Sequence, residues 1–309
     1  MKRCPISYEE IPSGLYSKKG LHRLNSALDN LNVLNFTGQE LIQESQKRMT
    51  KMSIQGVQPK ISARLSIKKR TFEFVDRHGI FILKPNPVQF SQVPENEDLT
   101  MRMAALSGIE VPLHGLIYNK DHELVYFIRR FDRIGKKRKI HVEDFAQVAG
   151  KSRETKYDSS MEKVAKLVEE FCTFPMVEKV KLFRLTLFSY LCGNEDMHLK
   201  NFSIIHRDGK IELSPAYDLL NSTIVLSNPK DELALPVGGK RSNFTKNILV
   251  NYFGHERLGL NKKVISSVEE QFKECFDDWI RLLEISFLSE TRKESYLAVL
   301  KQRRSAFGW

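Results

Sequence analysis

The sequence lacks any long apolar run. None of its stretches approaches the ~20 consecutive apolar residues that a membrane-spanning helix needs. Met1-Lys2-Arg3 is followed by Cys4 and Pro5, and not by the apolar core of a signal peptide. We therefore expect a soluble, cytoplasmic protein that makes no contact with a membrane.

Cysteine is also scarce. The four cysteines, Cys4, Cys172, Cys192 and Cys275, lie far apart, with no CxxC pair and no histidine at the spacing of a metal site. This pattern disfavours a cysteine-based metal site and predicts free thiols in a reducing compartment.

Acidic residues are fewer than basic ones, 38 against 49, which gives a formal net charge of +11. An excess of positive charge favours acidic partners such as nucleotide phosphates, nucleic acid or an acidic protein, without choosing among them. The two basic runs, residues 68–70 and 136–139, are short and have no interleaved aromatic residues for stacking on bases. We interpret both runs as solvated turns.

The hydrophobic pattern divides the chain into a β-rich part and an α-rich part. Residues 86–96, with Pro87 and Pro94, predict a loop, and a helix is expected from Glu97 to a stop at Gly108. Strands are expected at 61–67, 71–75, 80–84, 116–118 and 124–128, and helices at 161–171, 180–191 and most of 262–304. The fold class is therefore α+β, with a boundary near Phe131-Asp132 that separates residues 1–131 from residues 132–309.

The most informative motif follows the predicted 180–191 helix. Asp196 and Asn201 stand five residues apart, which is the Asp-x-x-x-x-Asn spacing of a protein-kinase catalytic loop. In such a loop the aspartate orients the attacking hydroxyl and the asparagine offers an oxygen to Mg²⁺. Asp218, after a predicted hairpin, would be the second metal ligand. Each of these residues on its own is also a common turn residue.

Two upstream features would serve the same chemistry. Lys84 ends an apolar strand, where a kinase carries the lysine that binds the α- and β-phosphates, and Glu97 or Asp98 would orient it. Residues 53–60 stand where a phosphate-covering loop is expected. This loop contains a single glycine, Gly56, and so departs from the Gly-x-Gly-x-x-Gly of ordinary protein kinases.

Five ordered segments resemble the motifs of the HipA-like kinases. They are residues 53–60, 130–133, 141–145, 196–203 and 217–218. The resemblance implies a two-lobed, protein-kinase-like fold with a β-rich N-lobe, an α-helical C-lobe and ATP in the cleft. It also implies a serine/threonine protein kinase toxin of a toxin–antitoxin system.

Specific roles follow from this resemblance. Asp196 would be the catalytic base, and Asn201 and Asp218 would hold Mg²⁺. Ser53 would be autophosphorylated, which would eject the adjacent loop and stop ATP binding. The resemblance assigns ATP binding to Gln55, Gly56, Val57, Gln58, Pro59, Lys60, Lys84, Arg129, Arg130, Phe131, His198, Leu199, Lys200, Asn201, Tyr217 and Asp218.

The length of the chain before Ser53 resembles the short HipT toxins of three-gene HipBST systems, in which a separate small protein, HipS, replaces a missing domain. That subtype implies HipS-like and HipB-like antitoxin partners, with DNA contacted only indirectly through an antitoxin. The implied substrate is a protein, an aminoacyl-tRNA synthetase. Pro59 departs from the acidic residue that HipA-type loops often carry.

Two other functions are compatible with the same residues. A lipid or small-molecule kinase of related fold also places aspartate, histidine and asparagine in a compact loop. A catalytically inactive scaffold or DNA-binding regulator would explain the positive charge, although Lys84, Asp196, Asn201 and Asp218 argue against it.

Overall fold

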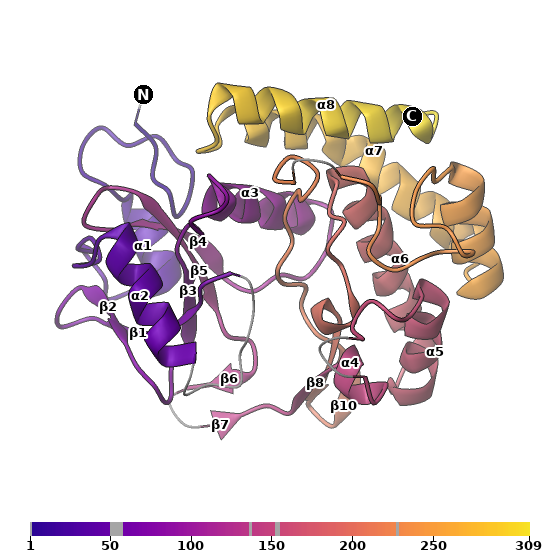
Figure 1. The fold of residues 1–309 in the computed structure, drawn as a ribbon, viewed down its shortest axis with the longest axis horizontal. Coiled ribbons are helices and arrows are strands. Elements are labelled where there is room, and N and C mark those ends of the chain that lie inside the picture. The colour runs from indigo at the N-terminus through magenta and orange to yellow at the C-terminus, as the bar shows by residue number, and fades with distance from the viewer. Residues whose placement is uncertain (1, 50–57, 136–137, 152–154, 227–228) are drawn as a thin grey trace. The chain divides into compact units, whose positions relative to one another are not determined.

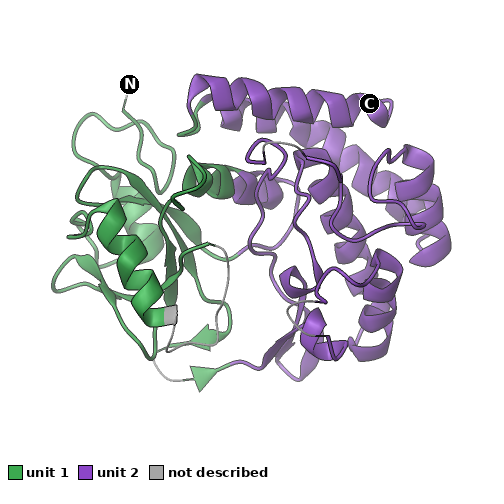
Figure 2. Cartoon of the chain, viewed as in Figure 1, with its two compact units in different colours: residues 1–99, 112–139, 285–288 green, residues 100–111, 140–284, 289–309 purple. Residues whose placement is uncertain are grey.

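The computed structural model describes all residues except 1, 50–57, 136–137, 152–154 and 227–228. Its chain folds into two compact units, coloured separately in Figure 2. Unit 1 comprises residues 1–99, 112–139 and 285–288, and unit 2 comprises residues 100–111, 140–284 and 289–309.

Unit 1 is built on a five-stranded antiparallel sheet with the order β2-β1-β3-β5-β4. The predicted strands are all present. The elements of this unit are α1 (Lys18–Leu24), α2 (Gly38–Met49), β1 (Ile61–Ser66), β2 (Thr71–Phe74), β3 (Phe81–Lys84), the first half of α3 (Val93–Leu106), β4 (His114–Tyr118), β5 (Leu124–Arg129), β6 (Arg133–Ile134) and β7 (Arg138–Lys139).

The core of unit 1 lies between this sheet and the N-terminal segment, with α1 and α2 beside the strands (Figure 1). Leu21, Leu24 and Leu41 from the two helices belong to the same buried cluster as Ile61 and other strand residues. The alternation along β1 therefore turns one face of the strand toward these helices, as a half-buried strand requires. The sequence did not predict α1 or α2.

Helix α3 corrects the expected loop at residues 86–96, because it begins at Val93 and not at Glu97. The Asn86 side-chain oxygen accepts a hydrogen bond from the Val93 N–H at 3.1 Å. Pro94 then falls in the first turn, where a missing N–H costs no intrahelical hydrogen bond. The predicted stop is confirmed, since α3 ends at Leu106 and Gly108 adopts a left-handed conformation with φ of 72°.

Unit 2 is mainly helical, with a small sheet of order β10-β9-β8. The predicted helices over 161–171 and 180–191 are confirmed. Its elements are β8 (Val142–Asp144), α4 (Phe145–Val148), α5 (Met161–Phe171), α6 (Pro175–Cys192), the 3-10 turn η1 (Leu199–Asn201), β9 (Ser203–Arg207), β10 (Lys210–Leu213), the π-helix η2 (Asn247–Arg257), α7 (Lys262–Glu284) and α8 (Glu290–Ala306).

Helix α6 places the predicted catalytic loop. It begins at Pro175, is buried along most of its length, and stops at Gly193, which has φ of 72°. Glycine reaches this left-handed conformation without a steric penalty and so ends the helix sharply. The chain that leaves α6 at Gly193 leads directly into residues 194–201.

Four large apolar residues of α7 are buried in a core. Trp279 is 1% exposed and packs edge-on against Phe188, with ring centroids 5.6 Å apart. Its indole N–H donates to the Met103 carbonyl at 3.2 Å. Phe272, Phe276 and Leu283 are buried as well.

All four cysteines are free thiols, and Cys275 is the one that is not buried. Within the described residues, no helix combines the length and the apolar character needed to cross a membrane.

Candidate active site

Four predicted site residues, Ser53, Gln55, Gly56 and Val57, lie outside the described residues. The described end of this loop approaches α3, since the Gln58 side-chain amide donates to the Glu97 carboxylate at 3.4 Å. Pro59 is buried and Lys60 is half-buried. Gln58 therefore connects the end of the predicted phosphate loop to an acidic residue of α3.

Lys84 is the most enclosed of the predicted site residues in unit 1. It ends β3, is 1% exposed, and forms an ion pair with Glu97 of α3, which is 2% exposed. The Lys84 ammonium also lies 5.4 Å from the centre of the Tyr126 ring. A buried charge is costly unless it is paired, so this strand lysine and helix glutamate form a rigid unit with a fixed ammonium position.

Asp98, the other carboxylate considered for Lys84, has a different partner. One of its oxygens lies 2.7 Å from Nδ1 of His114 on β4, and both side chains are buried. Successive residues of a helix point about 100° apart, so Glu97 faces β3 while Asp98 faces β4. The geometry selects Glu97 as the partner of Lys84.

Arg129, Arg130 and Phe131, which are predicted to bind ATP, lie at the end of β5, and Arg129 is the last residue of that strand. Arg129 is exposed, and the Arg130 guanidinium makes a two-point contact with Asp132 at 2.9 and 2.7 Å. Burial raises the pKa of the Asp132 carboxyl, but the hydrogen bond and charge of Arg130 outweigh it, so that this pKa lies below its ordinary value. Phe131, which stands between Arg130 and Asp132 in the sequence, is half-buried. This segment is held by side-chain ion pairing as well as by backbone hydrogen bonds.

In unit 2 the loop after α6 is closed by hydrogen bonds to the Asp196 carbonyl. The His198 N–H donates to it at 2.9 Å, and the Asn201 side-chain amide donates to it at 3.0 Å. Donation through Nδ2 fixes the direction of the Asn201 amide. None of the described residues donates to its oxygen, which is the atom that a magnesium ion prefers.

The Asp196 carboxylate accepts a hydrogen bond from the Tyr157 hydroxyl at 2.6 Å. Burial raises the pKa of Tyr157, and the hydrogen bond to Asp196 adds to the rise. Tyr157 therefore stays protonated and donates, and the Asp196 carboxylate accepts. Asp196 itself is half-buried.

His198 is held by a second residue of the same segment. The Lys156 ammonium lies 2.6 Å from Nε2 of His198, so that this nitrogen accepts and the ring proton resides on Nδ1. Burial lowers the pKa of His198 and outweighs the opposing charge of Asp196. Nδ1 is buried and has no partner among the described residues.

The remaining predicted residues differ in exposure. Leu199 is fully buried, whereas Lys200 is half-buried and its carbonyl accepts from the Tyr217 hydroxyl at 2.9 Å. Tyr217 also contacts the Ser203 hydroxyl at 2.5 Å. Asp218 has φ of 56°, a conformation that is uncommon outside glycine and that clusters at functional sites.

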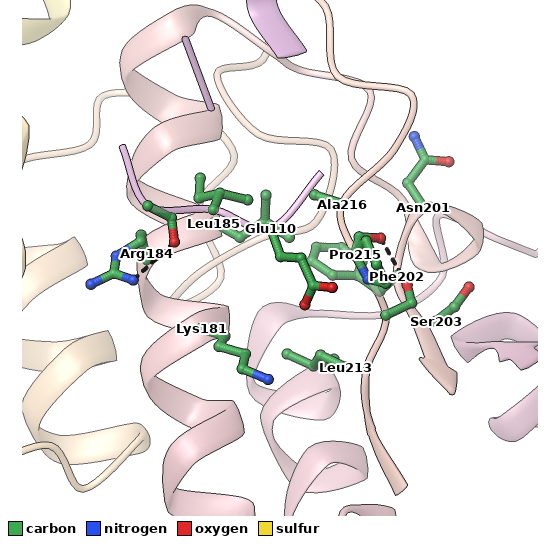
Figure 3. A pocket seen from close by; sticks show the side chains of 13 residues that line it. Glu110, Lys181, Arg184, Leu185, Asn201, Phe202, Ser203, Leu213, Pro215 and Ala216 are labelled. Carbon is green, nitrogen blue, oxygen red and sulfur yellow. Dashed lines mark hydrogen bonds between the residues drawn. The ribbon is translucent and has the colours of Figure 1, made fainter. Parts of the chain in front are cut away.

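A pocket of about 140 Å³ lies in unit 2 beside this loop (Figure 3). Asn201 and Ser203 line one side of it, and Lys181 and Arg184 of α6 line another. The Arg184 guanidinium donates to the Gly108 carbonyl at 3.2 Å. The lining includes neither Asp196 nor Asp218, so the pocket is separate from the carboxylates of the predicted site.

Residues 52–280 match the family of the HipA-like C-terminal domain. This match covers most of the chain, from the predicted phosphate loop into α7. The chain belongs to the HipA-like family.

Individual HipA-like proteins extend the comparison. A Haemophilus influenzae protein named "Putative kinase" is 30% identical over 97% of this chain and 94% of its own length. The "Serine/threonine-protein kinase toxin HipA" of Shewanella oneidensis is 27% identical, over 55% of this chain and 43% of its own length. The chain thus spans nearly all of one relative and less than half of the other.

The fold is that of HipA. A solved structure of Shewanella oneidensis HipA with HipB and operator DNA superimposes with a TM-score of 0.70 at 20% identity, covering 91% of this chain and 74% of that one. At this identity the likeness concerns the fold, and it confirms the predicted HipA-like fold class.

Two residues that contact the predicted catalytic loop, Lys156 and Tyr157, were not predicted from the sequence. They stand about forty residues before Asp196, and no motif marks them. A lysine beside a tyrosine in a polar segment is an ordinary surface pattern. Only the folded chain brings them to the Asp196 loop.

The donors of this loop fit a magnesium ion. Asn201 offers a neutral oxygen with a fixed direction, and the predicted second ligand, Asp218, would add a carboxylate to give the hard oxygen set that Mg²⁺ binds. The buried Nδ1–H of His198 has no acceptor among the described residues, and an oxygen atom of a bound group would accept its hydrogen bond.

Proposed function

We propose that this chain is an ATP-dependent serine/threonine protein kinase that acts as a toxin, with Asp196 as its catalytic residue. The observation that carries the proposal is the buried ion pair of Lys84 and Glu97. A strand lysine held by a helix glutamate is the arrangement by which protein kinases fix the cation that binds nucleotide phosphates. The fold alone would not carry a function.

Each predicted residue then has a physical role. Lys84 would bind the α- and β-phosphates, and Gln55 to Lys60 would cover them, with backbone N–H groups around Gly56 as donors. Asn201 and Asp218 would hold Mg²⁺, which supplies positive charge against the phosphate oxygens when it is bound. Arg129 to Phe131 would lie beside the adenine, and His198 to Lys200 and Tyr217 would line the phosphate end.

In the proposed reaction Asp196 orients a serine or threonine hydroxyl. The hydroxyl oxygen forms a bond to the γ-phosphorus, the bond from that phosphorus to the ADP oxygen breaks, and the hydroxyl proton is released with Asp196 as its acceptor. Tyr157 would hold the Asp196 carboxylate in one orientation. Positioning and charge supply most of the rate, because the transition state is loose.

Ser53 is the proposed site of autophosphorylation, and phosphorylation would place about −1.5 to −2 charges beside the phosphate loop. The test is to incubate the purified chain with labelled ATP and Mg²⁺ and to map the phosphorylated residue by mass spectrometry. Label on Ser53, lost in Ser53→Ala and kept in the exposed-serine control Ser26→Ala, is the expected result. Absence of label in the wild type under all metal conditions would contradict the proposal.

The toxin part of the proposal rests on the two HipA comparisons, one named a kinase toxin and the other solved with HipB and operator DNA. We propose HipB-like and HipS-like antitoxin partners, and DNA contact only through an antitoxin. The proposed acceptor protein is an aminoacyl-tRNA synthetase, following the resemblance described above. Labelled ATP added to a bacterial lysate with the purified enzyme would label the acceptor protein, which mass spectrometry would identify.

A further inference from the structure

Three side chains of the small sheet in unit 2 form a compact group with the composition of a metal site. They are His141, Glu143 and His206, and one potential ligand atom from each lies within 4.8 Å of the other two. The two imidazole rings meet edge to face with centroids 4.6 Å apart. Nε2 of His141 lies 2.9 Å from the Glu143 carboxylate.

The ladder between β8 and β9 puts these residues on one face. Val142 pairs with Ile205, and the His206 N–H donates to the His141 carbonyl at 3.0 Å, which extends the pairing by one residue. His141 and His206 therefore stand opposite each other, as directly facing residues of an antiparallel pair do. Glu143 is two residues from His141 and so points to the same side of the sheet.

We propose that His141, Glu143 and His206 bind a zinc ion. Two imidazole nitrogens and a carboxylate oxygen are a ligand set that Zn²⁺ favours, whereas Mg²⁺ prefers oxygen ligands throughout. Tetrahedral zinc with bonds of about 2.0–2.1 Å needs ligand atoms roughly 3.3 Å apart. The side chains of His141 and His206 are exposed and can close the remaining gap by rotation.

This site is distinct from the proposed magnesium site and does not depend on kinase activity. Its three ligands are Glu143 of β8, His206 of β9 and His141, the residue before β8, so zinc would cross-link these two strands. Strand β9 follows Asn201 after one residue, and Asp144 at the end of β8 caps α4 through the Gln147 N–H at 2.9 Å. Zinc would therefore stabilise the part of unit 2 that supports the predicted catalytic loop. Three protein ligands leave a fourth position for water, as in an open zinc site.

The alternative is a plain surface ion pair between Glu143 and a protonated His141, with His206 merely adjacent. An ion pair of this kind needs no metal and contributes little to stability. The two possibilities differ in whether His206 is required, because the ion pair involves His141 and Glu143 and not His206. The effect of removing His206 on zinc binding therefore distinguishes a zinc site from a plain ion pair.

The experiment is a zinc titration of the tag-free, full-length protein by calorimetry without nucleotide, with cobalt absorption as a second readout. Cys275 is changed to serine in every sample, because it is the one cysteine that is not buried and thiolates bind zinc. The variants are His206→Ala, His141→Ala and Glu143→Gln, and the exposed His22→Ala of α1 is the matched control. Thermal unfolding of each sample without metal shows that it is folded.

We expect one equivalent of zinc to bind, with affinity at least about tenfold weaker in each of the three variants and unchanged in His22→Ala. Zinc should also raise the unfolding temperature of the wild type, because a ligand that binds only the folded state stabilises it. Equal zinc affinity in the wild type and His206→Ala, or no binding at micromolar zinc, would overturn the proposal. A cobalt spectrum without the strong visible bands of tetrahedral coordination would count against the proposed geometry.

Discussion

In unit 1 the charged pair of Lys84 and Glu97 is almost sealed from solvent, whereas in unit 2 the Asp196 carboxylate is half-buried and held by the Tyr157 hydroxyl. The first arrangement makes charge part of the fold, because removing either partner takes away the opposite charge that offsets the cost of burying the other. The Asp196 carboxylate can be replaced by a neutral group without leaving a buried charge behind. Substitutions at the Lys84 pair should therefore change stability and function together, whereas substitutions at Asp196 should change function and leave stability nearly unchanged.

The sharpest test of this separation is Asp196→Asn. Without a carboxylate to orient the hydroxyl, we expect phosphate transfer to fall by about a hundredfold to ten-thousandfold. Because the side chain is half-buried and the substitution keeps its shape, the free energy of unfolding should change by no more than about 0.5 kcal/mol. Rates of label incorporation and urea unfolding curves measure the two quantities.

Asp208→Asn is the matched control, since Asp208 is an exposed aspartate in the turn between β9 and β10 with φ of 52°. It should leave both quantities unchanged. An Asp196→Asn enzyme with wild-type transfer would refute the catalytic role, and one that fails to fold would refute the separation between the units.

Glu97→Ala should show the opposite behaviour. It leaves the Lys84 ammonium buried without its carboxylate, which costs about 3–5 kcal/mol of stability. Nucleotide affinity should fall as well, because Lys84 loses its fixed position. Urea unfolding and an ATP-dependent thermal shift measure these effects.

Glu73→Ala is the comparison variant in the same sheet, because Glu73 pairs with Arg64 and Lys69, which are largely exposed. Surface ion pairs contribute about 0–1 kcal/mol. Equal losses of stability in Glu97→Ala and Glu73→Ala would show that the burial of the Lys84 pair has no energetic importance.

The elements with strong periodicity could be predicted from the sequence. Alternation marked β1 and helical spacing marked α6, because each has one face or most of its surface against a core. Helix α3 was predicted too short because Pro94 indicates a loop, and the contact of Asn86 with the start of the helix is visible only in the folded chain. Helices α1 and α2 were missed although each has an N-terminal cap: Ser17 accepts from the Gly20 N–H, and Thr37 and Glu40 form a capping box.

The candidate site, like the fold, could be predicted from the sequence only in part. Asp196, Asn201 and Lys84 stand in motifs with fixed spacing, so their residue types could be recognised. The contact of Tyr157 with Asp196 and that of Lys156 with His198 depend on how the 155–160 segment folds back on the loop. The spacing of residues along the sequence does not predict such contacts.

A rise in pH should change the free energy of unfolding in opposite directions through Glu95 of unit 1 and His198 of unit 2. Burial raises the pKa of Glu95 in α3 from 4.5 to about 7, so that between these values the folded state holds more protons than the unfolded state. The free energy of unfolding then falls as pH rises from 4.5 to 7. For His198, whose pKa is lowered by burial, the unfolded state holds more protons just below pH 6.5, and the free energy of unfolding rises with pH there.

Glu95→Gln should therefore stabilise the protein at pH 8 by about 1 to 3 kcal/mol and leave it nearly unchanged at pH 4, since each pKa unit corresponds to about 1.4 kcal/mol. His198→Asn should flatten the loss of stability below pH 6.5. Urea unfolding between pH 4 and 8 measures both effects, with the exposed Glu274→Gln as control. A gain from Glu95→Gln that is the same at pH 4 and pH 8 would show that ionisation is not its cause.

The smallest effect is expected from Tyr157→Phe, which removes the donor to Asp196 and keeps the ring. Because the Asp196 loop is still fixed through its backbone, we expect transfer to slow by about three- to tenfold, in line with the roughly 1 kcal/mol that a hydrogen bond contributes. Tyr252→Phe is the matched control, since its hydroxyl also donates to a carboxylate, that of Glu162, at 3.2 Å. Its transfer rate should equal that of the wild type. If both variants slow equally, the Tyr157 contact has no special role in holding Asp196, and the position of the carboxylate is set by the α6 end and the Asn201 contact alone.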